Sequence, residues 1–236
     1  MAGSRRRSRQ LALDLPEAPR WGGPRAGAGR KPSGVEAGVS HRRELRVTRH
    51  TPIHVTLRAR SHVWNLRSRR GHRAVEEALR GVHGRPGFRV VHFSVQGNHV
   101  HLVVEADDRR ALACGMKALT RRLAAALNAL MRRAGPVFRD RYHAHVLRTP
   151  RETANALAYV LANFASHAAR RGERVARTYL DEYSSAAPAG PDGSPPPVSA
   201  PRSWLLRLAG ERLATEVHGP DLPGARALRG GGDERP

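Results

Sequence analysis

Alternating and helical apolar patterns follow one another along the chain and predict one α+β domain. Apolar and polar residues alternate at 53–59, 88–95 and 99–105, which predicts three strands, and a fourth strand follows a loop within 137–147. Apolar residues recur every three or four positions at 74–82, 110–133 and 149–170, which predicts three helices. This order favours a ferredoxin-like antiparallel sheet with its helices packed on one side.

The two longer helices carry apolar stripes and end signals. The stripe of the first comprises Leu112, Met116, Leu119, Leu123, Leu127 and Leu130. Gly135-Pro136 is expected to terminate that helix. The second helix has a well-marked start, because Thr149 can cap it, Pro150 suits its first position and Glu152 completes a capping box. Its buried stripe is expected to comprise Leu157, Val160, Leu161 and Phe164.

Low apolar periodicity marks both ends of the chain. We expect a disordered basic arm at 1–49, the folded domain at 50–185, a linker rich in Ser, Ala, Pro and Gly at 186–202, and a disordered tail at 219–236. Residues 203–218 predict a short amphipathic helix. Its pattern fits equally a helix that docks on the domain and one that binds a partner.

A large excess of positive charge points to a polyanionic partner. The chain carries 42 Lys and Arg against 20 Asp and Glu, a formal net charge of +22. A GC-rich genome explains many arginines but not the excess of bases over acids, so DNA or RNA is the expected partner. The single Cys114 excludes an internal disulfide and a cysteine-based zinc site. No apolar run is long enough to span a bilayer, so we expect no membrane partner and a cytoplasmic, nucleoid-associated protein.

The predicted strand at 99–105 carries two histidines. Because the side chains of a strand alternate between its faces, His99 and His101 point to one face and the intervening valine to the other. Two imidazoles side by side provide half of a metal site. With 13 histidines in the chain, however, about 0.7 such pairs are expected by chance. A second pair also occurs at His143-Ala144-His145, so the spacing alone is weak support for a metal.

A tyrosine and an asparagine lie one turn apart on the last predicted helix. Tyr159 and Asn163 are four residues apart and therefore share a face. At about 100° per residue, this face points well away from the apolar stripe. A phenol and an amide that project together from the polar side form a candidate site, although a surface tyrosine that partly covers a neighbour gives the same pattern.

Several motifs occur together in a distinctive order: Gly97-Asn98-His99-Val100-His101, the amphipathic helix, Phe138-Arg139-Asp140-Arg141-Tyr142-His143, Tyr159-Val160-Leu161-Ala162-Asn163 and Tyr183-Ser184-Ser185. In this order, over about residues 50–185, the chain resembles the single-tyrosine HUH transposases of the IS200-like superfamily. Within it, the chain is most similar to the branch associated with repetitive extragenic palindromes. The resemblance implies that His99, His101 and Asn163 bind Mg²⁺ or Mn²⁺, that Tyr159 is the nucleophile, and that the protein is a homodimer.

The implied activity is transposition of DNA, with cleavage of single-stranded DNA at hairpin ends and rejoining through a 5′-phosphotyrosine. A phenol ordinarily ionises near pH 10, so a cation on the scissile phosphate is needed to neutralise charge and orient the attack. The family often has Asn-Pro after the tyrosine, whereas Phe164 follows Asn163 here. We interpret this departure as a longer helix.

Basic side chains at six positions are expected to contact DNA phosphates: Arg30, Lys31, Arg121, Arg122, Arg139 and Arg141. A solvated surface accounts for them almost as well. Tyr142, beside the second histidine pair, is a weaker candidate nucleophile, and Tyr179 and Tyr183 fit packing or loop positions. His54-Val55-Thr56 resembles half of a two-histidine phosphoesterase signature, but no second half follows.

Two other functions remain open. One is a domesticated, non-catalytic regulator that binds DNA or RNA and keeps the fold and the charge. The other is a replication or plasmid-transfer nickase of the wider HUH group, whose members usually carry more than this short domain.

Overall fold

A computed structural model describes residues 45–164, 168, 172, 174 and 179–217 of the chain. The expected basic arm lies outside these residues up to position 44, and the expected tail at 219–236 lies outside them entirely. The described elements, in chain order, are β1 (Ile53–Arg58), α1 (Arg69–Arg80), β2 (Phe88–Val95), β3 (His99–Ala106), α2 (Arg109–Leu130), β4 (His143–Val146), α3 (Pro150–Leu161) and α5 (Trp204–Val217).

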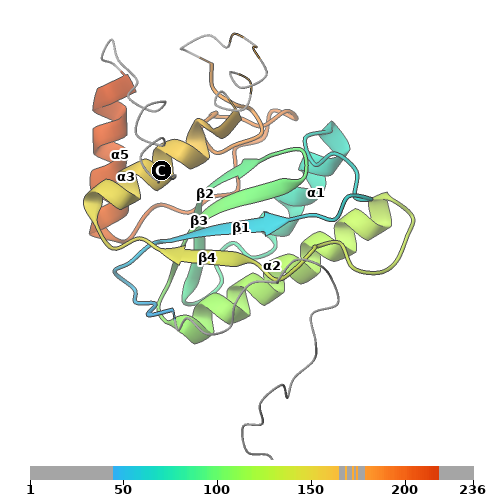
Figure 1. Cartoon of the computed structure of the whole chain (residues 1–236), viewed down its shortest axis with the longest axis horizontal. Coiled ribbons are helices and arrows are strands. Elements are labelled where there is room, and N and C mark those ends of the chain that lie inside the picture. Colours follow the sequence, from blue (N-terminus) through green and yellow to red (C-terminus); the bar gives the residue numbers. More distant parts are fainter. Residues whose placement is uncertain (1–44, 165–167, 169–171, 173, 175–178, 218–236) are drawn as a thin grey trace, which may run out of the picture. The chain divides into compact units, whose positions relative to one another are not determined.

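The four strands form one antiparallel sheet in the order β2-β3-β1-β4, which confirms the predicted α+β class and antiparallel sheet. Figure 1 shows β1 and β3 in the middle of the sheet. β2 and β3 are joined by a tight turn, in which the Gln96 N–H donates to the His99 carbonyl at 2.8 Å. β1 is therefore the immediate neighbour of the strand that carries His99 and His101.

One face of the sheet packs against α1 and α2. The buried side chains of this main core include Ile53, Val55 and Leu57 from β1, Leu102 and Val104 from β3, and the stripe of α2. Gly115 of α2 is the point of closest approach, because a Cβ built on it would lie 2.2 Å from the ring of Phe88. The helices α1 and α2 thus cover the apolar face of the sheet, and the opposite face is left for other elements.

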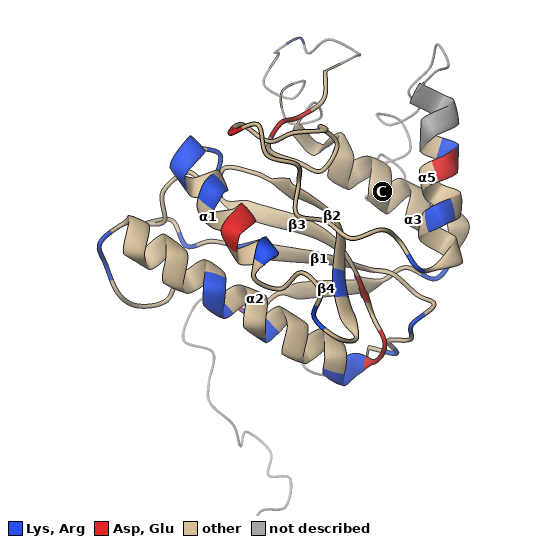
Figure 2. Cartoon of the chain, turned by 180° about the vertical axis from the view of Figure 1, so that it is seen from behind, with Lys and Arg blue, Asp and Glu red and all other residues tan. Residues whose placement is uncertain are grey.

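The other face carries α3, so the prediction that all helices pack on one side is wrong. Val91 and Val103, which point away from the main core, form a second apolar cluster with Val160 of α3 and Leu206 of α5. In Figure 1, α3 and α5 lie together beside the sheet, while Figure 2 shows α1 and α2 from the other side. The sequence pattern marked which residues are apolar but not which face of the sheet each helix covers.

The start of α3 follows its prediction closely. The N–H of Glu152 donates to Thr149 Oγ1 at 3.2 Å, and Pro150 occupies the first turn. The Glu152 carboxylate accepts the backbone N–H of Arg148, the residue before the cap, at 2.7 Å. Thr149 therefore caps the helix as predicted, and Glu152 reaches back to the residue before it.

The end of α2 differs from its prediction. α2 ends at Leu130, before the expected stop at Gly135-Pro136, and Arg132 already adopts a left-handed φ of 51°. The N–H groups of Met131, Arg132 and Arg133 still donate to carbonyls of its last turn, at 2.9 to 3.1 Å. α3 ends at Leu161 with Ala162 as its cap, and Asn163 and Phe164 are helical again, while the expected end near Arg170 lies outside the described residues.

The segment that follows Tyr183 lines the open edge of β2. The Val95 N–H donates to the Tyr183 carbonyl at 2.9 Å, and the Ser199 N–H donates to the Val90 carbonyl at 2.8 Å. The nearly buried Glu105 carboxylate then accepts the backbone N–H groups of Arg202 and Ser203, at 2.7 to 3.1 Å, just before α5 begins. Backbone groups of this edge are thereby satisfied, and α5 is positioned against α3.

The sequence left open whether this helix docks on the domain or binds a partner, and the structure shows that α5 packs within the chain. Its Leu205 and Leu206 are buried, whereas Trp204 is 60% exposed. No helix in the described part of the chain combines the length and apolar character needed to cross a membrane.

Candidate active site

Five histidines and a threonine lie on the sheet face that carries α3. In the register, Thr56 is opposite His101 on one side and His143 on the other, and His54 is opposite Val103 and His145. Residues directly opposite each other on antiparallel strands point to the same face. We call this set the histidine face: His54, Thr56, His99, His101, His143 and His145.

His101 is held in place by the neighbouring strand. Its side chain is only 4% exposed, and its Nδ1 atom lies 3.2 Å from both His54 Nε2 and Thr56 Oγ1. The rings of His54 and His101 stack with their centroids 5.3 Å apart. A metal-binding imidazole is commonly oriented through the ring nitrogen that does not bind the metal, and Nδ1 of His101 has such partners.

His99 is held by a local contact. Its Nδ1 atom lies 2.8 Å from Asn98 Oδ1, so Nδ1 donates to the amide oxygen. The ring of His99 stands perpendicular to that of His101, with centroids 4.7 Å apart. The two imidazoles therefore share one small region at the start of β3, as the alternation of the strand predicts.

Tyr159 points from α3 onto the histidine face. Its half-buried ring meets His101 edge-on, with centroids 5.1 Å apart, and lies 5.9 Å from the ring of His54. Val160, the next residue, packs against Val91 and Val103 of the sheet. The adjacent apolar cluster thus fixes the rotation of α3 that directs Tyr159 towards the histidines.

Asn163 lies just past the end of α3. Its side chain is fully buried, and neither its amide nitrogen nor its amide oxygen has a hydrogen-bond partner among the described residues. A buried amide without partners is costly, and in a folded protein it typically marks a position where water, an ion or a ligand binds. α3 ends at Leu161 with Ala162 as its cap, and Asn163, four residues beyond Tyr159, is helical again.

Phe164 is helical, as the interpretation of a longer helix requires, although the helix is interrupted at Ala162. Its ring lies 4.1 Å from the guanidinium of Arg67, whose other side stacks on Tyr183 at 4.3 Å. Arg67 also donates two hydrogen bonds of 2.8 Å to Asp181. The chain after Tyr159 is thus held against the loop between β1 and α1 by Arg67, which stacks on Phe164 and pairs with Asp181.

The second histidine pair belongs to the same face, which sequence reasoning missed. His145 is hydrogen-bonded to Glu152 at the start of α3, and both His143 and His145 are exposed. Burial, with smaller contributions from the neighbouring His145 and His143, lowers the pKa of His54 to about 4. His54 is therefore neutral at pH 7 and offers one donor and one acceptor nitrogen.

Of the expected phosphate contacts, two lie near the histidine face and two do not. The Arg139 N–H donates to the Arg58 carbonyl at 2.9 Å, next to His99 in the register, and Arg141 is exposed two residues further on. Arg121 and Arg122 are exposed on α2, the layer on the opposite face, where basic residues lie along the helix in Figure 2. Arg30 and Lys31 lie outside the described residues.

The alternative tyrosines have other surroundings. Tyr142 packs against the main core, and burial raises its pKa. Tyr183 contacts Arg67 and meets the ring of His72 edge-on at 5.0 Å. Tyr179 lies 5.6 Å from the ring of Phe164 and is 42% exposed.

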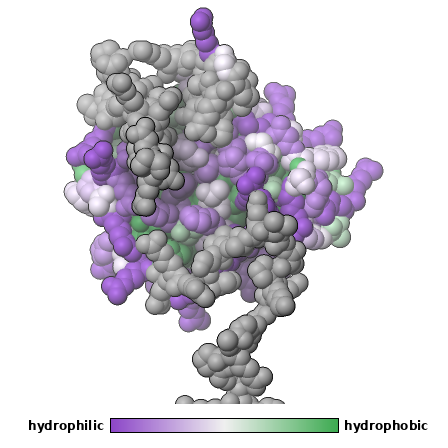
Figure 3. Space-filling view, in the orientation of Figure 1, coloured by the Kyte–Doolittle hydropathy of each residue, from purple (hydrophilic) through white to green (hydrophobic). Residues whose placement is uncertain are grey.

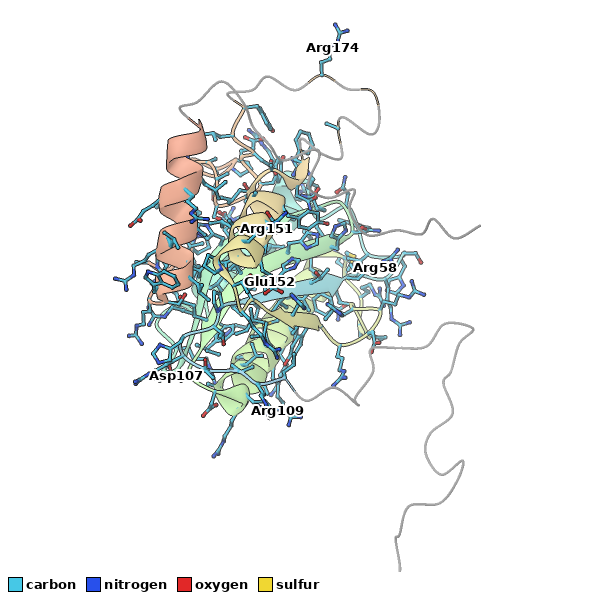
Figure 4. The ribbon with its side chains drawn as sticks, turned by 60° about the vertical axis from the view of Figure 1, so that its left-hand side comes forward. Arg58, Asp107, Arg109, Arg151, Glu152 and Arg174 are labelled. Carbon is cyan, nitrogen blue, oxygen red and sulfur yellow. The ribbon has the colours of Figure 1, made fainter. Side chains whose placement is uncertain are left out.

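Charged side chains lie at the two ends of the histidine face. Figure 4 shows Glu152 at the start of α3, over the sheet, and Arg58 at the far end of β1. Within the described residues, no group of three or more His, Cys, Asp and Glu side chains is arranged to hold a metal ion. Two histidines and the amide of Asn163 are a different donor set, with two nitrogens and one oxygen.

Comparisons with known proteins leave the family open. No family model and no curated protein matches the chain. Among solved structures, the chain is similar to a REP-associated tyrosine transposase bound to a REP hairpin, with 14% identity and a TM-score of 0.46 over 55% of this chain and 74% of that one. It is also similar to a bacterial tRNA(His) guanylyltransferase (Thg1)-like protein in complex with GTP, with 10% identity and a TM-score of 0.39 over 55% and 71% of the two chains.

Proposed function

We propose that the chain is a metal-dependent endonuclease and strand transferase of single-stranded DNA at hairpin ends, in which Tyr159 is the nucleophile. The observation that carries this proposal is the position of the Tyr159 ring, 5.1 Å from the ring of the buried His101. A phenol set beside two oriented imidazoles combines a nucleophile with candidate metal ligands. The net charge of +22 supports a polyanionic substrate.

His99, His101 and Asn163 are the proposed ligands of Mg²⁺ or Mn²⁺. The fit rests on two oriented imidazoles and on a buried amide that has no hydrogen-bond partner among the described residues. Mixed nitrogen and oxygen ligands are more typical of these cations than of a closed zinc site. When bound, such a cation neutralises charge on the scissile phosphate and stabilises the departing oxygen.

In the proposed step, the Tyr159 oxygen attacks phosphorus and the bond from phosphorus to the 3′-oxygen breaks. The phenolic proton passes to water, and the departing 3′-oxygen takes up a proton to become a hydroxyl. The product is a 5′-phosphotyrosine, and attack by a 3′-hydroxyl reverses the step. Because the ester bond is conserved, rejoining needs no ATP.

The direct test is formation of a covalent adduct between the protein and a labelled single-stranded hairpin in the presence of Mn²⁺. Wild-type protein is expected to form the adduct, and Tyr159→Phe is expected to form none. Tyr142→Phe is the matched control, because it removes a hydroxyl from the other candidate tyrosine and should leave the adduct. An adduct with Tyr159→Phe would contradict the proposal.

The non-catalytic regulator remains the second candidate. It is favoured by the net charge of +22, which binding of DNA or RNA alone explains, and by the hydrophilic side chains that prevail on the face shown in Figure 3. For such a regulator, DNA binding would survive chelation, and no nicking would occur with Mn²⁺ or Mg²⁺. Nicking by the wild type that is lost in Tyr159→Phe would exclude it.

A further inference from the structure

An exposed tryptophan lies on the loop that follows β1. Trp64 is 53% exposed, whereas Val63 and Leu66 on either side of it are buried in the main core. The loop is therefore anchored by two apolar residues, and packing does not require an indole between them. Few large apolar side chains in the described residues are this exposed: Trp64, Tyr179, Leu180 and Trp204.

The Trp64 loop lies against the turn that leads into His99. The Leu66 N–H donates to the Gly97 carbonyl at 2.9 Å, and the Ala59 N–H donates to the Asn98 carbonyl at 2.8 Å. Trp64 is two residues from Leu66, and His99 is two residues from Gly97. By chain reach, the two residues are no more than about 20 Å apart.

Exposed arginines surround this loop. Arg58 ends β1 opposite His99, and Figure 4 shows it at the end of the sheet away from the start of α3. The Arg60 N–H donates to the Val137 carbonyl at 2.9 Å, and the Arg139 N–H donates to the Arg58 carbonyl at the same distance. The backbone N–H of Trp64 donates to Met131 Sδ at 3.5 Å, so the loop also contacts the end of α2.

We propose that Trp64 is a stacking platform for a base of single-stranded DNA, and that Arg58, Arg60 and Arg139 bind the adjoining phosphates. Bases of unpaired strands stack on exposed aromatic rings, and basic grooves follow the backbone. The bases of a continuous duplex are already stacked on one another and leave no face for the indole. This inference rests on the proposed function, because it places the substrate strand between Trp64 and Tyr159.

The test compares Trp64→Ala with Trp204→Ala, a similarly exposed tryptophan on α5. Binding of the full chain to labelled single-stranded, hairpin and blunt duplex DNA is measured by anisotropy with EDTA present. Trp64→Ala is expected to weaken binding to the first two by between about 5- and 150-fold. Trp204→Ala should bind as wild type does, and duplex binding should be unchanged in both variants.

The salt dependence separates stacking from charge. Trp64→Ala removes no charge and should keep the wild-type slope of affinity against salt, while Arg60→Ala should reduce that slope by about 0.7. Trp64→Ala binding within twofold of wild type would overturn the proposal. An equal loss in Trp204→Ala, or an equal loss on duplex DNA, would do the same.

A second measurement covers a variant that does not fold. In Trp21→Phe, Trp204→Phe protein, Trp64 is the only remaining tryptophan, and single-stranded DNA is expected to quench its fluorescence. Absence of quenching at a DNA concentration that saturates binding would overturn the proposal. If no DNA is cleaved but the Trp64 effect is present, the catalytic proposal fails and this one stands.

Discussion

The Nε2 atom of His54 lies 3.2 Å from the Nδ1 atom of His101, and this contact joins β1 to the strand that carries the proposed metal ligands. Thr56 Oγ1 lies at the same distance from that nitrogen. Either partner can orient the ring of His101, so the ring is expected to stay in place when only one of them is removed.

The first prediction follows from this shared contact. The double variant His54→Ala, Thr56→Val should raise the Mn²⁺ concentration needed for half-maximal cleavage by roughly 10- to 100-fold, with smaller shifts in the single variants. His50→Ala, on an exposed turn, is the control and should leave the metal requirement unchanged. A titration of cleavage against Mn²⁺ measures the effect. An unaltered requirement in the double variant would show that His101 is held by other contacts.

The pairing of His99 with His101 could be predicted from the sequence because it depends only on the alternation of one strand. The contact between His54 and His101 could not, because it joins residues 47 positions apart through the register of two strands. The sequence nonetheless contained two indications of this contact. A ferredoxin-like order sets the first strand beside the third, and His54 alternates with apolar residues in the same way as His101 does.

The surroundings of the tyrosine helix were harder to predict. The pattern separated Tyr159 from the apolar stripe, whereas its side chain packs against the apolar cluster that contains Val160. The side of the sheet that α3 covers depends on how the chain connects after β4. The stacking of Phe164 on Arg67 joins distant loops, and no periodicity encodes such a contact. The hydrogen bonds of residues 183–199 to β2 were likewise missed, because this stretch lacks the alternation of a strand.

The second prediction concerns Arg67 and Asp181. Both side chains are largely buried, at 14% and 3% exposed, so Arg67→Ala leaves an unpaired carboxylate in the interior. We expect the free energy of unfolding to fall by about 3 to 5 kcal/mol, measured by urea unfolding. The exposed pair of Arg73 and Glu77 is the matched control, and Glu77→Ala should cost less than about 1 kcal/mol. Equal losses at the two sites would contradict this account.

The third prediction is that acid destabilises the fold below about pH 6.5. Burial lowers the pKa of His72 and of His92 to about 4, so between pH 6.5 and 4 the unfolded chain binds more protons than the folded one. The free energy of unfolding must therefore fall as the pH falls through this range. Burial raises the pKa of Glu76, which acts in the opposite direction and offsets part of the loss.

The measurement is the unfolding midpoint at pH 7.5, 6 and 5. The midpoint should decrease steadily for the wild type and decrease less for the double variant His72→Gln, His92→Gln. The variant is compared with itself across pH, so a general loss of stability does not disturb the result. A wild-type midpoint that stays constant from pH 7.5 to 5 would show that these histidines are protonated in the fold.

The fourth prediction tests the contact between α2 and the sheet. A Cβ on Gly115 would lie 2.2 Å from Cγ of Phe88, a buried ring that cannot move without opening the main core. Gly115→Ala should therefore destabilise the protein by about 1 to 3 kcal/mol, although alanine favours a helix more than glycine does. Gly210→Ala on α5 is the matched control, because no atom lies within 4 Å of its added Cβ. With the same gain in helix propensity and no clash, it should stabilise the fold by about 0.5 to 1 kcal/mol. Opposite signs of the two changes in urea unfolding would confirm that close packing, and not propensity, requires glycine at position 115.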